Sequence, residues 1–167
     1  MNTSDTKRVI FSENDFLVSK TDLKGRLTYC NQSFIKAAGY SESELIGKPH
    51  NIVRHPDMPK SIFKLLWDRI QSGNEIFAFV KNKTKDGGYY WVYANVTTST
   101  DSSGKAIGYY SVRRKVNENA LQTIENLYSK LISIEKNQNM TASEKYLNKI
   151  LEEKGISYDE YISSLQG

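Results

Sequence analysis

The chain has 167 residues, of which 38% are apolar, and this length and composition indicate one modest core with appended segments. Its formal net charge is +4, but lysines and acids are interspersed, so no helix or motif concentrates the charge for nucleic acid. The longest apolar run is far shorter than the ~20 residues of a membrane-spanning helix, and the N-terminus has no signal-peptide segment. We expect a cytoplasmic protein that binds no nucleic acid.

The first third of the chain predicts a hairpin followed by short helices. Residues 1–13 are polar and lack periodicity, so they are predicted to be a flexible segment. Two strands are predicted near residues 16–18 and 27–30, with a turn at Gly25 between them. Asn31 suits the N-cap of the next helix, and residues 41–44 have capping-box spacing for another.

The middle of the chain changes from helical to strand periodicity. Residues 49–59 contain all three prolines and predict a connector, and residues 59–72 predict a helix whose apolar face includes Trp67. Three strands follow, predicted over residues 75–84, 89–98 and 106–115. This order predicts an α+β domain over residues 14–116, with a five-stranded antiparallel sheet and short helices on one face.

Residues 117–167 predict a helical C-terminal extension. An amphipathic helix is predicted over residues 117–136, and capping-box patterns at 141–144 and 157–160 predict two more helices. These helices either fold back on the core as a cap or dock on a membrane receptor or a second copy, and both alternatives stay open. Deletion after about Lys136 is expected to leave the cofactor site intact and to weaken association.

The chemistry of the chain is concentrated in the connector. The sequence has no GxGxxG, Walker, HExxH or GxSxG motif, so we expect neither an enzyme nor a metal site. The run HNIVRHPDMP at residues 50–59 places two imidazoles, a guanidinium and a carboxylate between helices. The simplest interpretation makes Asp57 the cap of the next helix, Arg54 a surface cation and His55 a polar loop residue.

A second interpretation comes from a resemblance. Residues 22–34 and 39–47 resemble a PAS domain, and the RHPDMP run resembles the narrower Aer-type branch, as do residues 80–83 and 90–95. The chain is similar in particular to the CetB type, a separate PAS protein that works with a membrane-anchored chemoreceptor carrying HAMP and signalling modules. The resemblance implies non-covalently bound FAD, redox sensing for aerotaxis, and a receptor partner or a homodimer.

The resemblance also implies which residues bind the cofactor. Carried over by position, they are Arg54, His55, Asp57, Trp67, Asn82, Trp91 and Asn31. A guanidinium suits a pyrophosphate, and an amide suits the mixed polar edge of a flavin. Each tryptophan also has a structural interpretation: Trp67 as a core residue on the apolar face of its helix, and Trp91 as a residue that covers the sheet. His55, held charged by a nearby phosphate, is expected to make FAD affinity pH-dependent.

Two other PAS functions stay open at this point. One is a haem-binding gas sensor with His50 or His55 as the axial ligand. The other is an interaction module with an empty pocket.

Overall fold

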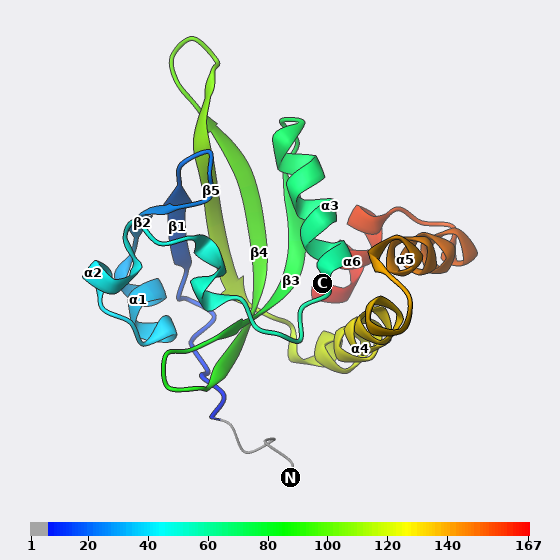
Figure 1. Ribbon diagram of the computed structural model, residues 1–167. Helices are drawn as coiled ribbons and strands as arrows, with labels where there is room; N and C mark the ends of the chain where they lie inside the picture. The colour runs from blue at the N-terminus through cyan, green and yellow to red at the C-terminus, as the bar shows by residue number, and fades with distance from the viewer. Residues whose placement is uncertain (1–6) are drawn as a thin grey trace.

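The computed structural model describes residues 7–167, which are built around one five-stranded sheet (Figure 1). The strand order is β2-β1-β5-β4-β3, and every neighbouring pair is antiparallel. The strands are β1 (Leu17–Thr21), β2 (Leu27–Cys30), β3 (Ile76–Lys83), β4 (Tyr89–Thr100) and β5 (Ala106–Lys115). Pairing of β1 with β5 joins the first hairpin to the meander, and the predicted α+β fold is confirmed.

Short helices connect β2 to β3 on one face of the sheet. They are α1 (Gln32–Ala38), α2 (Glu42–Leu45), a 3-10 helix at His50–Val53, and α3 (Lys60–Gln71). Asn31 caps α1 by accepting a hydrogen bond from the Phe34 N–H at 3.0 Å, and Ser41 and Glu44 form the predicted reciprocal box at α2. α3 packs on β3 and β4 and forms the wall of the site described below (Figure 1).

The predicted cap of α3 by Asp57 is wrong. Pro59 occupies the N-cap position and makes no side-chain hydrogen bond to the helix. The Asp57 carboxylate instead accepts from Lys81 Nζ on β3 at 2.8 Å. An aspartate just before a helix is a local capping signal, but Asp57 lies two residues before the N-cap Pro59 and instead forms an ion pair with a neighbouring strand.

The C-terminal extension consists of three helices beside the β3 edge (Figure 1). A 3-10 turn at Glu118–Ala120 leads into α4 (Leu121–Asn137), which is followed by α5 (Met140–Lys154) and α6 (Tyr158–Gln166). The capping box predicted at residues 141–144 is wrong, because Asn139 caps α5 by accepting from the Ala142 N–H at 2.8 Å. The N-cap predicted at Ser157 is present.

These helices fold back on the core, which is the first of the two alternatives. β3 is an edge strand, so alternate carbonyls along it have no partner strand. The Tyr128 hydroxyl of α4 donates to the Phe79 carbonyl at 2.6 Å, and the Tyr158 hydroxyl of α6 donates to the Phe77 carbonyl at 2.9 Å. The extension therefore satisfies carbonyl groups of an edge strand that would otherwise be available to pair with another chain.

The N-terminal segment is packed where the structure describes it. Arg8 bridges to Tyr89 of β4 and forms a two-bond ion pair with Glu118 at 2.8 and 3.1 Å, while Phe11 packs edge-on against Tyr90. Within the segment expected to be flexible, Arg8 and Phe11 thus make contacts with the core, and residues 1–6 lie outside the described part of the chain. Within residues 7–167, no helix combines the length and apolar character that crossing a membrane requires.

Candidate functional site

A cavity of about 340 Å³ lies between the sheet and the connecting helices. Its volume is near the low end of the roughly 300–1,000 Å³ of small-molecule sites. Alternate residues of β1, β3, β4 and β5 form its floor, and one face of α3 forms its wall: Phe63, Leu66, Trp67 and Ile70. The turn before β2 and the 3-10 helix form the rim. The two-residue period of the strands aims these side chains into one space.

Three of the predicted cofactor residues meet in this cavity. Arg54 follows the 3-10 helix and bridges to Asn82 of β3, and its guanidinium lies 3.5 Å from the centre of the Phe63 ring. Trp67 packs edge-on against Tyr109 at 5.4 Å between ring centres. Arg54, Trp67 and Asn82 thus present a cation, an indole and an amide to the same space.

Two buried hydrogen-bonding groups of the cavity have no partner among the described residues. They are Nδ2 of Asn82 on β3 and Oγ of Ser111 on β5. Leaving a buried donor unsatisfied costs about 1–3 kcal/mol, and native folds rarely tolerate it without a reason. Both groups are therefore suited to hydrogen bonding with a ligand in the cavity.

The cavity also contains a buried pair that sequence reasoning did not find. Arg113 of β5 is 4% exposed, and its Nη2 lies 2.5 Å from His50 Nε2, which also lies 3.2 Å from the Ser19 hydroxyl. Burial, reinforced by the Arg113 charge, lowers the pKa of His50 to about 3, so the ring is neutral and Nε2 accepts from the guanidinium. The alternation of Tyr109, Ser111 and Arg113 along β5 was the available signal.

The charged residues that line the cavity all have the same sign. They are Lys24 at the rim, Arg54 and Arg113, and no acidic residue lines the cavity in the described chain. Burial lowers the pKa of Arg113 only to about 10, so it stays charged at neutral pH. A buried cation without a carboxylate favours a ligand that carries or acquires negative charge.

His55 and Asp57 do not line this cavity. The His55 Nδ1 accepts from the Asp57 N–H at 3.0 Å, and the Asp57 carboxylate binds Lys81, whose ammonium lies 4.7 Å from the centre of the Tyr89 ring. Burial and the Lys81 charge lower the pKa of His55, which favours its neutral ring, and its charging by a bound phosphate stays a prediction. These residues therefore hold the connector, which includes Arg54, against β3.

Trp91 and Asn31 also lie away from the cavity. Trp91 is on the opposite face of the sheet, where its ring packs 6.0 Å from that of Tyr128. The Asn31 side chain accepts from the Val18 N–H at 3.0 Å and donates to the Phe16 carbonyl at 2.7 Å, in addition to capping α1. Its amide therefore joins β1 to α1.

Comparison with known proteins agrees with this architecture. The model of the PAS fold matches residues 27–113. The aerotaxis receptor of Escherichia coli strain K12 is 39% identical over 120 residues, covering 72% of this chain and 24% of the receptor. The nitrogen fixation regulatory protein of Klebsiella pneumoniae is 24% identical over 59% of this chain and 20% of its own length.

A solved light-oxygen-voltage domain, studied with a flavin analogue, has the same fold. It superposes with a TM-score of 0.57 at 23% identity, over 66% of this chain and 86% of that domain. The chain spans about a quarter or less of the length of the two curated relatives. From the match over residues 27–113 and the similarity to the aerotaxis receptor, this chain belongs to the PAS fold family.

Proposed function

We propose that this protein is an FAD-binding PAS sensor that reports redox state for aerotaxis to a membrane-anchored chemoreceptor. The observation that carries the proposal is the cavity. It contains two unpartnered hydrogen-bonding groups and an indole in its wall, and the described residues that line it include cations but no acid. The similarity to an aerotaxis receptor supports the same proposed function. We place the protein in the cytoplasm with no catalytic role, and a homodimer is a further candidate assembly.

The residues of the cavity fit a flavin. Bound flavin supplies reversible electron acceptance, and its ring gains negative charge or a proton on reduction. Asn82 and Ser111 would hydrogen-bond the polar ring edge, and Trp67 would pack on the ring. The cavity volume suits a ring system, so the rest of the dinucleotide would extend toward the rim.

The contacts of the two histidines favour flavin over haem. His50 Nε2 already meets Arg113 and Ser19, and His55 lies outside the cavity. The absorption spectrum of purified protein tests the proposal, because flavin absorbs near about 370 and 450 nm and haem near about 400 nm. Chromatography of the released cofactor then distinguishes FAD from FMN. A spectrum with aromatic absorption alone, unchanged by added FAD, would reject flavin binding.

We predict that Arg54→Ala lowers FAD affinity about 10- to 100-fold, the value of a charge-assisted hydrogen bond worth roughly 1.5–3 kcal/mol. The Arg54 side chain stacks on Phe63 and makes no hydrogen bond or ion pair within the described chain, so it is available to a phosphate. Flavin fluorescence titration measures the change. Arg114→Ala is the control, because Arg114 is exposed on the other face beside Tyr93. Equal FAD affinity in wild type and Arg54→Ala would remove Arg54 from the site.

We predict that Arg113→Gln lowers the midpoint potential for two-electron reduction of bound FAD by on the order of 40 mV. A unit charge about 7 Å away in a protein interior is worth about 2 kcal/mol, and that energy stabilises the more negative, reduced state. Redox titration of the flavin absorbance measures the potential, and Arg114→Gln serves as the matched control. An unchanged potential would show that the Arg113 charge does not act on the ring.

A further inference from the structure

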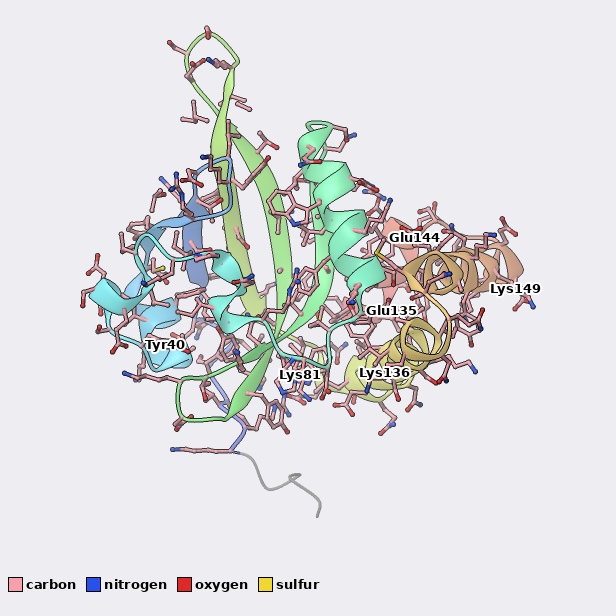
Figure 2. All side chains as sticks on the ribbon, in the orientation of Figure 1. Tyr40, Lys81, Glu135, Lys136, Glu144 and Lys149 are labelled. Atoms are coloured by element: carbon pink, nitrogen blue, oxygen red, sulfur yellow. The ribbon has the colours of Figure 1, made fainter. Side chains whose placement is uncertain are left out.

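The helix that forms the cavity wall has its N-terminus capped by another helix. The first two amides of α3, those of Lys60 and Ser61, donate to the carboxylate of Glu135 at 2.8 and 3.0 Å. Glu135 lies near the end of α4, and Figure 2 shows it beside the first turn of α3. A carboxylate at this place satisfies two of the helix's unpaired N–H groups and meets the positive end of its dipole.

The same carboxylate connects to α5. The Ser143 hydroxyl donates to Glu135 Oε2 at 2.8 Å and lies 2.8 Å from the Ser61 hydroxyl. Ser61 is 1% exposed and Ser143 is fully buried, so water does not compete for these bonds. Three helices therefore meet at one charge-assisted network, in which the loss of one partner leaves others unsatisfied.

This network is close to the ligand-facing side chains. Phe63 and Trp67, one and two turns after Lys60, line the cavity, and Phe63 supports the Arg54 guanidinium. A displacement of the first turn of α3 therefore moves the surface on which Arg54 stacks. Packed helices transmit such shifts rather than absorbing them, because interiors are close-packed.

We propose that Glu135 is a positioning residue of the cavity, through which α4 and α5 both set ligand affinity and respond to the ligand. Glu135 lies outside the segment matched to the PAS fold, residues 27–113. The proposal rests on the proposed function for the identity of the ligand, FAD. Because coupling between two sites is reciprocal, α5 must respond to the cavity as strongly as the cavity responds to α5.

The first test is hydrogen exchange of flavin-free protein. Glu135→Gln is expected to speed exchange of the amides at residues 60–67 by about tenfold, the loss of one charge-assisted hydrogen bond. Glu125→Gln is the matched control, because Glu125 is exposed on the same helix and makes no hydrogen bond or ion pair among the described residues. Unchanged exchange in Glu135→Gln would overturn the proposal, and this result does not depend on flavin.

The second test is the response to FAD. In the wild type, saturating FAD is expected to slow exchange at residues 140–147 of α5, and Glu135→Gln is expected to lose that response and to bind FAD several-fold more weakly. Ser143→Ala keeps the charge at α3 and removes the link to α5, so it is expected to lose the α5 response and to weaken FAD binding less than Glu135→Gln does. This variant also serves if Glu135→Gln does not fold.

A wild-type α5 response that persists in Ser143→Ala would overturn the coupling. Failure of the wild type to bind FAD would instead reject the proposed function, while the flavin-free exchange would still decide the role of Glu135.

Discussion

The free energy of unfolding is expected to fall by about 2 kcal/mol between pH 7.5 and pH 5, and His50→Gln is expected to lose most of this dependence. The pKa of His50 is lowered from 6.5 to about 3, because the ring is buried and faces the Arg113 guanidinium. Protonation would place an N–H opposite that cation and break the contact at Nε2.

The sign of this change in the free energy of unfolding follows from which state, native or unfolded, binds the proton. Below pH 6.5 the unfolded chain protonates this histidine, whereas the native protein does so only near its pKa of about 3. The stabilisation is therefore complete above pH 6.5 and is lost as the pH falls from 6.5 to about 3, by on the order of 5 kcal/mol in total. Carboxylates with lowered pKa values, such as that of Asp57, add their own loss mainly below about pH 5.

Urea unfolding at matched flavin occupancy, followed by far-ultraviolet circular dichroism, measures this dependence. His55→Gln is the matched control, since the pKa of His55 is also lowered but its ring lies outside the cavity. The control is expected to keep most of the wild-type slope between pH 7.5 and pH 5. Equal slopes in wild type and His50→Gln would show that the buried ring does not resist protonation.

Elements that depend on local signals could be predicted from the sequence. β5 has the predicted bounds, because residues 106–115 alternate in side-chain direction and follow a glycine turn. Asn31 and Ser41 cap their helices as expected, since a cap involves groups only three residues apart.

Features that depend on distant residues could not be predicted in this way. Glu135 caps a helix that begins 75 residues earlier, and His50 and Arg113 are 63 residues apart. Asp57 shows the opposite error: its local signal for a cap was overridden by Lys81, 24 residues away. In the site, Arg54, Trp67 and Asn82 line the cavity, whereas His55 and Asp57 support it from outside.

A chain ending at Lys136 is expected to lose its cooperative fold rather than to keep its cofactor site, which revises the expectation from sequence. The deletion removes α5 and α6, and with α6 the Tyr158 hydroxyl that binds the edge of β3. It takes away buried side chains that include Leu147, Leu151, Tyr158, Tyr161 and Ile162. Burying each is worth roughly 1.5–3 kcal/mol, so the upper estimate for the set is comparable to the ~5–15 kcal/mol stability of a whole domain.

The deletion also exposes groups that remain on the chain. The Phe77 carbonyl of the edge strand loses the Tyr158 hydroxyl, and the Asn117 N–H loses the Gln166 side chain that accepts from it at 2.9 Å. An uncovered edge strand pairs readily with other chains, so the shortened protein is expected to aggregate. Thermal melting and gel filtration measure both effects.

A milder variant separates edge protection from the loss of core. Tyr158→Phe keeps the buried ring and removes only the hydroxyl bond to Phe77, so it is expected to cost about 1 kcal/mol and to leave the protein monodisperse at its wild-type size. If the shortened chain melts like the full chain and retains FAD, then α5 and α6 contribute no stability to the sensor core. In that case their buried faces would serve association, and the expectation from sequence would hold.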